Sequence, residues 1–379
     1  MRLKILQLTG DWKWTGPAEP MVQLGLGLRE RGHTVDLACA RPPAGEERGV
    51  AIEAEKRGLT PRLQFAPGRG IRLAGDLRTS RALAGLLREG GYDVVHCWHT
   101  RDHVLALRAR GFRRRTGGPA IVRSWRRAEP PAQDPATRWL FGPGCDGLVC
   151  VSPGAAAAAA PLRGGRPVTG CFGAVDLERF RADADAETAR GELGLPEDAW
   201  VVGIVARVQP HRRFDLLLAA AARLFEAEPR ARLLVVGRGT KRAELAEGPA
   251  RELGIADRVV FAGWRGPDYA AVLRSIDLFT FLVPGSDGTC RALLEAAACG
   301  IPAVASRRGA LPEIVRDGET GVLVDETPEA LAAAWLLLLR DEDRRRELGA
   351  AARVRAEREF VPARFAEAVD ALYREVLKP

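Results

Sequence analysis

The sequence has no apolar run that reaches the roughly 18–20 residues needed to span a bilayer as a helix. It also has no Cys-x-x-Cys pair, and its seven cysteines are an odd number scattered along the chain. The five histidines show no metal-ligand spacing. We therefore expect reduced thiols, mostly buried as small hydrophobic side chains, and no metal site.

Features of nucleic-acid-binding proteins and of secreted proteins are also scarce. Aromatic residues make up 6% of the chain and no recognised nucleic-acid-binding motif occurs, so the net charge of +8 favours anionic ligands or an anionic membrane surface. The segment from Met1 to Leu8 enters a strand pattern at once and lacks the apolar region and cleavage site of a signal peptide. We expect a cytoplasmic protein, with peripheral contact at the inner face of a membrane left open.

The residues that are present indicate a soluble α/β protein. Hydrophobic residues make up 46% and charged residues 28%, and 379 residues are enough for two domains. Residues 3–9, 21–31 and 34–39 follow a strand, helix, strand pattern that predicts a parallel sheet with covering helices. A second series of this kind begins at Trp200, and we place the connection between the two domains around residues 164–197.

A helix expected over residues 74–89 combines leucines on one side with a basic remainder. This pattern is typical of an amphipathic surface helix, and it also suits contact with anionic lipid headgroups. The residues concerned are Leu77, Leu83, Leu86, Leu87, Arg72, Arg78, Arg81 and Arg88.

The segment from Gly285 to Pro302 organises the second half of the chain. It follows an apolar run, Ile276 to Val283, and its small, turn-forming residues lead into an expected helix that ends at Gly300. A helix start offers unpaired backbone N–H groups and partial positive charge, which favour a phosphate. Asp287 and Glu295 can then bracket a polar ligand, although a turn aspartate and an ordinary helix glutamate would give the same pattern.

Polar side chains stand after several other strand patterns of the second half. Arg207, Arg212 and Arg238 follow two of them, and carboxyl ends of parallel strands converge on one crevice. Guanidinium groups and backbone N–H groups together form a site for a diphosphate. Trp264 and Arg265 follow a third strand and can stack on a base.

The first half offers fewer candidate residues. The loop around Gly16 follows the first strand, where doubly wound folds bind ligands, but it is not a Gly-x-Gly-x-x-Gly fingerprint. His96 and His99 lie near the end of a strand over residues 92–99 and are candidates for contact with a sugar or acceptor. A histidine in a strand is more often structural, so both interpretations stay open.

Several blocks resemble the GT4 family of retaining glycosyltransferases. Arg207-Val208-Gln209-Pro210-His211-Arg212 is similar to the family's R-x(4)-K signature, and Asp287-x(7)-Glu295 to its E-x(7)-E motif. The block from Leu294 to Ala305 resembles the specific LEAMACGxPVVA sequence. Shorter matches in the same order are Arg31-Gly32-His33-Thr34-Val35, Asp93-Val94-Val95-His96, Gly173-Ala174-Val175-Asp176 and Glu313-Ile314-Val315-x(2)-Gly318-x(2)-Gly321.

The resemblance implies a GT-B fold, in which two Rossmann-like domains face a cleft. It places the acceptor on domain 1–170, the nucleotide-sugar donor on domain 171–360, and a helix over 361–379 packed back on the first domain. It also implies transfer with retention of configuration, without a metal ion or other cofactor. The expected acceptor is a glycan or lipid-linked sugar of envelope polysaccharide or lipopolysaccharide assembly.

The resemblance also implies roles for individual residues. Arg207 and Arg212 neutralise the leaving diphosphate, Glu295 holds the ribose and Asp287 the sugar. The remaining donor contacts come from the loops at Gly16, Ser286, Gly288 and Thr289 and from Arg238, Trp264 and Arg265.

Three positions depart from the family pattern. Asp287 replaces a glutamate, Arg212 replaces a lysine, and Arg126 stands where many members carry a histidine that contacts the donor sugar. These departures leave two alternatives open. One is a binding protein that kept the fold and lost transfer, and the other is a nucleotide-sugar epimerase.

Overall fold

A computed structural model describes residues 1–14, 18–66, 73–112, 117–183, 185–284 and 288–378. The chain forms two compact units, Met1–Phe172 with Pro362–Pro379, and Gly173–Val361. The boundaries expected from the sequence, after residues 170 and 360, lie within two residues of these limits.

The first unit contains a parallel sheet of seven strands in the order β3-β2-β1-β4-β5-β6-β7. Every residue of β4 is buried, as expected for a parallel strand that is covered on both faces. The strands are β1 (Lys4–Thr9), β2 (Thr34–Ala40), β3 (Pro61–Phe65), β4 (Val94–Cys97), β5 (Ala120–Trp125), β6 (Gly147–Cys150) and β7 (Val168–Gly170).

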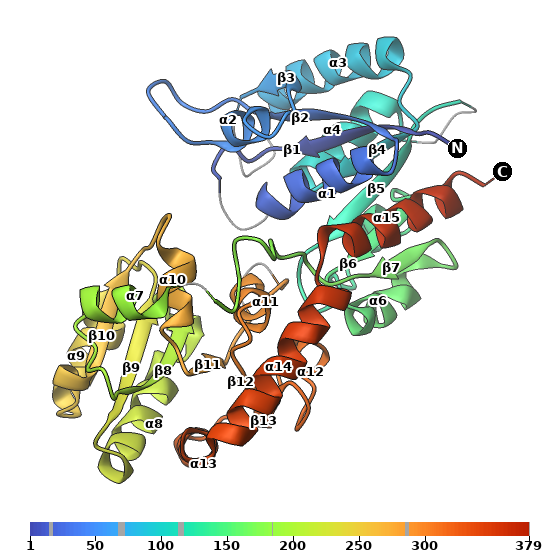
Figure 1. Cartoon of the computed structure of the whole chain (residues 1–379). Helices are drawn as coiled ribbons and strands as arrows, with labels where there is room; N and C mark the ends of the chain where they lie inside the picture. Colours follow the sequence, from blue (N-terminus) through green and yellow to red (C-terminus); the bar gives the residue numbers. More distant parts are fainter. Residues whose placement is uncertain (15–17, 67–72, 113–116, 184, 285–287, 379) are drawn as a thin grey trace. The chain divides into compact units, whose positions relative to one another are not determined.

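Helices cover this sheet, and the last helix of the chain is among them (Figure 1). α15 packs against α1, and a side chain at Gly27 would come within 2.9 Å of the Ala366 Cβ atom. The helices are α1 (Ala18–Glu30), α2 (Val50–Glu55), α3 (Leu73–Gly90), α4 (Thr100–Arg110), α5 (Pro135–Phe141), α6 (Pro153–Ala159) and α15 (Pro362–Val376), with a 3₁₀ turn at Ala160–Arg163.

A buried carboxylate fixes α15 to the amino-terminal part of the unit. Asp370 Oδ2 accepts from Arg31 Nε at 3.1 Å and Oδ1 accepts from Arg374 Nε at 3.0 Å, and His33 Nε2 lies 3.1 Å from Oδ1. Gly32 between the two N-terminal partners has φ of 86°, a left-handed conformation that glycine adopts without strain. The Arg31-Gly32-His33 block therefore serves as the docking site of the C-terminal helix.

The second unit repeats the architecture with six parallel strands in the order β10-β9-β8-β11-β12-β13. The strands are β8 (Trp200–Val205), β9 (Ala231–Val236), β10 (Val259–Gly263), β11 (Leu278–Phe281), β12 (Ala303–Ser306) and β13 (Gly321–Val324). The helices are α7 (Ala186–Glu192), α8 (Phe214–Ala227), α9 (Gly248–Glu252), α10 (Tyr269–Arg274), α11 (Arg291–Ala298), α12 (Leu311–Ile314), α13 (Pro328–Arg340) and α14 (Glu342–Glu359), with 3₁₀ turns at Pro210–Arg212 and Ala256–Arg258.

Two segments differ from the expectation. The connection expected around residues 164–197 contains β7 and α7, and most of it belongs to the second unit. The sequence also predicts a single helix from about Lys241 to Leu253, whereas the structure has a π-helical turn, Ala243–Glu247, that continues into α9. Pro249 explains the break, because it has no N–H to donate and its ring crowds the preceding turn.

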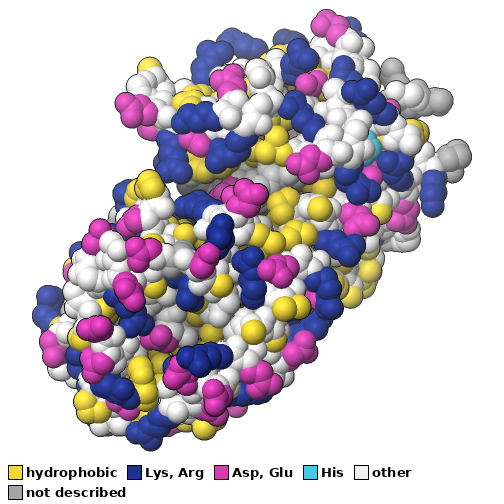
Figure 2. Space-filling view, in the orientation of Figure 1, with side chains coloured by type: hydrophobic (Ala, Val, Ile, Leu, Met, Phe, Trp, Pro, Cys, Tyr) yellow, Lys and Arg dark blue, Asp and Glu magenta, His cyan; other side chains and the backbone are white. Residues whose placement is uncertain are grey.

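The surface carries charges of both signs. On the face drawn in Figure 2, basic and acidic side chains are interspersed. Among the described residues, no helix is long and apolar enough to cross a membrane.

Candidate functional site

The second sheet reverses its strand order between β8 and β11. In open α/β sheets, ligands bind outside the carboxyl ends of the strands at such a switch point. Arg207 to Arg212 follow β8, and the segment that leads into α11 follows β11. The topology thus brings together the two halves of the predicted donor site.

Two glycines hold the ends of β8 and β9 close together. Gly237 has φ of 142°, and a Cβ atom there would lie 2.2 Å from the Ala206 carbonyl oxygen. A Cβ atom at Gly239 would lie 2.4 Å from the Val208 carbonyl oxygen. The Gly237–Gly239 turn therefore packs directly on the segment that carries Arg207, with Val208 N donating to Arg238 O at 3.0 Å.

Arginine side chains gather at this edge, and no acidic partner for them occurs among the described residues. Arg207 is exposed and, within the described ranges, pairs with no side chain. Arg212 Nη1 donates to Val283 O at 2.6 Å, whereas its buried Nε has no acceptor in the described part of the chain. Burial and the charge of Arg207 lower the pKa of Arg212, and burial with the charges of Arg212 and Arg207 lowers that of His211. An anion here would relieve this repulsion.

The start of α11 is conformationally unusual. Cys290, which precedes the helix, has φ of 50°, and Arg213, which precedes α8, has φ of 56°. This left-handed conformation raises the free energy of a non-glycine residue, and residues that adopt it tend to lie at functional sites. Gly288 and Thr289 are buried, and a Cβ atom at Gly173 would lie 3.2 Å from the Thr289 Cβ atom. Ser286, Asp287 and Gly16 lie outside the described residues.

Glu295 lies in α11 and is buried, at 5% exposure. Tyr269 Oη donates to its Oε2 at 2.7 Å, and Arg291 Nε lies 3.2 Å from its Oε1. Two donors on different oxygens fix the plane of the carboxylate. Sequence reasoning identified Glu295 but missed Tyr269, because the two residues are 26 positions apart and belong to different helices.

The residues predicted to contact a base have different surroundings. Trp264 is 51% exposed, and the Arg238 guanidinium lies 4.9 Å from its ring centroid. Arg265 is tied into its own turn, with Nη1 3.0 Å from Asp268 and Nε donating to Ala262 O at 3.1 Å. Trp264 therefore has the exposed ring that stacking requires, whereas Arg265 supports the local turn.

In the first unit the strand order reverses between β1 and β4. His99 follows β4, and its Nε2 lies 3.2 Å from Asp11, which follows β1. Arg126 follows β5, is 9% exposed, and places its guanidinium 5.2 Å from the Trp98 ring centroid. His99 and Arg126 are thus at the ligand-binding edge of this sheet, and Asp11 is a residue that the sequence did not single out.

His96 does not have the predicted role. It is fully buried, with Nδ1 2.5 Å from Tyr373 Oη and Nε2 2.8 Å from Ser124 Oγ. Burial and the charges of Arg123 and Arg126 lower its pKa to about 3, so the ring is neutral. With both nitrogens engaged inside the unit, His96 connects the sheet to α15 instead of contacting a sugar or acceptor.

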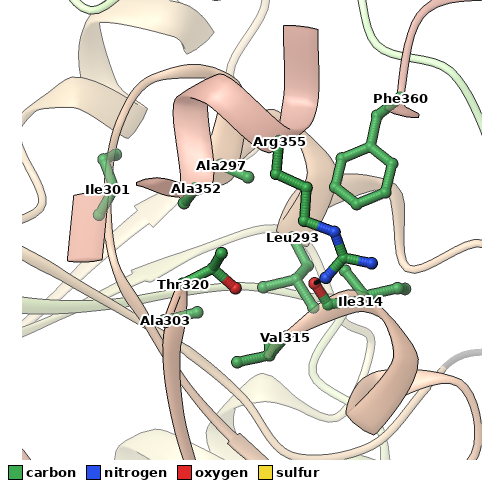
Figure 3. Close-up of a pocket in the computed structure, with 10 residues that line it drawn as sticks. All are labelled: Leu293, Ala297, Ile301, Ala303, Ile314, Val315, Thr320, Ala352, Arg355 and Phe360. Atoms are coloured by element: carbon green, nitrogen blue, oxygen red, sulfur yellow. Dashed lines mark hydrogen bonds between the residues drawn. The ribbon is translucent and has the colours of Figure 1, made fainter. Parts of the chain in front are cut away.

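A small cavity is lined by residues of α11, α12 and α14, among them Leu293, Ile314 and Ala352 (Figure 3). Its volume of about 10 Å³ is close to the minimum for one water molecule. Arg355 lines it but donates to Ile314 O and Glu313 O, both at 2.6 Å. The cavity is therefore a packing defect and not the ligand site.

These features define a protein with two Rossmann-like units and a group of arginines at the switch point of the second sheet. Residues 185–355 match the model described as glycosyl transferases group 1, and residues 16–179 match glycosyltransferase family 4. A protein named D-inositol 3-phosphate glycosyltransferase from Thermomonospora curvata is 33% identical over 86% of this chain and 85% of its own. A protein of the same name from Thermobispora bispora is 33% identical over 97% of this chain and 92% of its own. The chain belongs to the GT4 family of glycosyltransferases.

Solved structures agree with this fold. A glycosyltransferase from Rickettsia africae superimposes with a TM-score of 0.81 at 14% identity, covering 100% of this chain and 99% of its own. Anabaena Alr3699/HepE in complex with UDP and glucose superimposes with a TM-score of 0.76 at 18% identity, covering 98% and 99%. The fold is GT-B, as the sequence predicted.

Proposed function

We propose that the chain transfers a sugar from a nucleotide-sugar donor to an acceptor hydroxyl, with retention of configuration and without a metal ion. The donor half of this proposal rests on the arginines at the switch point of the second sheet, between β8 and β11. Arg207, Arg212 and Arg238 have no carboxylate partner within the described ranges, and the charges of Arg212 and Arg207 lower the pKa of the neighbouring His211. A diphosphate supplies the missing negative charge, and a solved structure of the same fold contains UDP.

In this proposal each site residue contacts a different part of the donor. Arg207 and Arg212 stabilise the negative charge that builds on the diphosphate as the glycosidic bond breaks. Glu295 accepts from the ribose hydroxyls, Asp287 from a sugar hydroxyl, and Trp264 stacks on the base. The low dielectric at the partly buried Arg212 makes its charge more effective than the same charge in water.

The acceptor has two candidates. The first is a glycan or lipid-linked sugar of envelope polysaccharide or lipopolysaccharide assembly, as the family resemblance suggests. The second is a phosphorylated inositol, which the name of the 33% identical relatives favours. Arg126 and Lys13 at the ligand-binding edge of the first unit supply positive charge for either a phosphate or a pyrophosphate.

One assay tests the proposal and its alternatives. The purified chain is incubated with UDP-, GDP- and ADP-linked sugars and with inositol phosphates, glycans or lipid-linked sugars, with and without EDTA. Proton NMR of the product should show the donor's anomeric configuration, at equal rates in both conditions. Nucleotide binding without turnover on any acceptor would favour a non-catalytic binding protein, and conversion of the donor sugar without acceptor would favour an epimerase.

Membrane contact is a separate part of the proposal. Arg78, Arg81 and Arg88 are exposed on α3, together with Leu77 at 38% exposure. This face can adsorb to anionic lipid, with each arginine contributing about 1 kcal/mol near the surface. Co-sedimentation with phosphatidylglycerol vesicles at low salt, lost when the three arginines become glutamine, would support it; equal sedimentation of the triple variant would contradict it.

A further inference from the structure

We infer that Tyr269 is a positioning residue for Glu295, and that this tyrosine sets how strongly the site prefers a nucleotide with a ribose 2′-hydroxyl over its 2′-deoxy form. The inference rests on the proposed function, because it takes Glu295 as the acceptor for the ribose hydroxyls. It adds a specificity-determining residue that the sequence motifs do not contain.

The hydroxyl of Tyr269 is a directed contact and not incidental packing. It donates to Glu295 Oε2 at 2.7 Å, while Arg291 Nε lies 3.2 Å from Oε1. Burial and the negative charge of Glu295 both raise the pKa of Tyr269 well above its ordinary value. The hydroxyl therefore stays protonated and keeps donating, and the carboxylate cannot rotate without losing its contact with Tyr269 or with Arg291.

The tyrosine ring is itself held in place. Its centroid lies 5.7 Å from that of Phe180 at an interplanar angle of 79°, an edge-to-face arrangement. The Arg179 guanidinium lies 5.1 Å from the Phe180 ring centroid and 5.9 Å from that of Tyr269, and it donates to Gly266 O at 3.2 Å. These contacts hold the ring in the orientation in which its hydroxyl reaches Glu295.

A turn near the start of the second unit positions Arg179 and Phe180, the two residues that contact the Tyr269 ring. Asp176 Oδ1 accepts from the backbone N–H groups of Glu178 and Arg179, both at 3.0 Å, and Phe180 N donates to Asp176 O at 2.9 Å. Asp176, the last residue of the Gly173-Ala174-Val175-Asp176 block, is therefore the first residue in a series of contacts. The series runs from the Asp176 turn through Phe180 and Tyr269 to Glu295.

The test compares affinities for matched nucleotides. Isothermal titration calorimetry measures UDP, GDP and ADP, and the 2′-deoxy form of each, against the full chain. A hydrogen bond to a charged acceptor corresponds to a preference of about tenfold to a hundredfold for the ribonucleotide that binds. Tyr269→Phe should reduce this ratio to about threefold or less while leaving the affinity for the 2′-deoxy form within about twofold, because only the carboxylate's orientation is lost.

The first unit provides a matched control. Tyr92 Oη donates to Asp36 Oδ2 at 2.7 Å, and Arg62 Nε donates to Asp36 Oδ1 at 3.1 Å. The same tyrosine, carboxylate and arginine arrangement thus occurs away from the proposed donor site. Tyr92→Phe should keep the full ribonucleotide preference, and thermal unfolding of both variants shows whether they are folded.

Each outcome decides the inference. An unchanged ratio in a folded Tyr269→Phe variant overturns the role of Tyr269 and leaves the proposed function standing. A wild-type chain that binds nucleotides without preferring the ribose form overturns the role of Glu295 and that of Tyr269 with it. A wild-type chain that binds none of the six nucleotides overturns the proposed function itself. In the double variant Tyr269→Phe with Glu295→Ala, the ratio should equal that of Glu295→Ala alone, since the tyrosine acts only through the carboxylate.

Discussion

Replacing Arg207 by alanine should separate stability from activity. The side chain is exposed and pairs with no residue in the described part of the chain, so the folded state loses no hydrogen bond or ion pair among those residues. Its charge lowers the pKa of Arg212 and of His211, so removing it also relieves repulsion. We expect the free energy of unfolding to stay within about 0.5 kcal/mol of the wild-type value.

The effect on turnover should be far larger. In the proposed mechanism Arg207 meets charge that develops on the leaving diphosphate, and removing one such donor lowers kcat by about 10²- to 10³-fold, or about 2.7–4 kcal/mol. The whole loss of turnover should arise in the chemical step, in which the glycosidic bond of the donor breaks. Steady-state kinetics with the active donor and acceptor measure it, with circular dichroism melting on the same samples.

His211 gives a second measurement that does not depend on activity. Its pKa is lowered by burial, by Arg212 and by Arg207, so Arg207→Ala removes one of the three causes. NMR titration of the imidazole should show the pKa rising toward the ordinary value of about 6.5. Arg251→Ala, which removes an exposed arginine from α9, is the control with the same change in net charge.

Two results would refute the reasoning. Turnover of Arg207→Ala within about threefold of wild type would remove the phosphate role, because a single oxyanion donor is worth more than that. An unchanged His211 pKa would show that the two side chains do not interact as the structure places them. Loss of activity in Arg251→Ala would point to net charge as the cause.

Further predictions concern the buried histidines, the docking of α15, the Gly237 turn and stacking on the nucleotide base. Burial, with nearby arginine charges, lowers the pKa of His96 and of His103 to about 3, so each takes up its proton only on unfolding and the free energy of unfolding falls as the pH drops from 6.5 toward 3. Urea unfolding of His96→Gln between pH 4.5 and 6.5 should show a slope smaller by about 1.4 kcal/mol per pH unit, and an unchanged slope would contradict the burial. Asp370→Asn should cost about 3 kcal/mol in urea unfolding, because it leaves Arg31 and Arg374 without the buried carboxylate that they share; a cost under about 0.5 kcal/mol would show that the contact does not hold α15. Gly237→Ala should weaken nucleotide binding in calorimetry, since its Cβ atom would lie 2.2 Å from a carbonyl oxygen of the Arg207 segment, and unchanged affinity would argue against that packing. Trp264→Ala should reduce affinity for all nucleotides by about tenfold in calorimetry, as expected for a lost stacking surface, and equal affinities would exclude stacking.

Local patterns were enough to predict the two sheets. Apolar strands such as β8 and β11, each followed by a helix, favour parallel pairing wherever they occur. The same patterns placed Arg207 and Arg212 just after β8, and a polar residue at the carboxyl end of a parallel strand faces the ligand-binding edge by topology alone. The π-helical turn before α9 and the helix in the expected connection were missed, because short helices carry weak periodicity.

The sequence by itself determined the class of fold and the cationic strand ends, since both follow from local patterns of residue types along the chain. Only the tertiary structure decided what individual polar residues do. His96 and His99 lie three positions apart, yet one is buried under α15 and the other reaches Asp11 at the edge of the sheet. Glu295 acquires its orientation from Tyr269, which another helix supplies. Burial and pairing of this kind depend on segments distant in sequence, and no local pattern records which of them will meet.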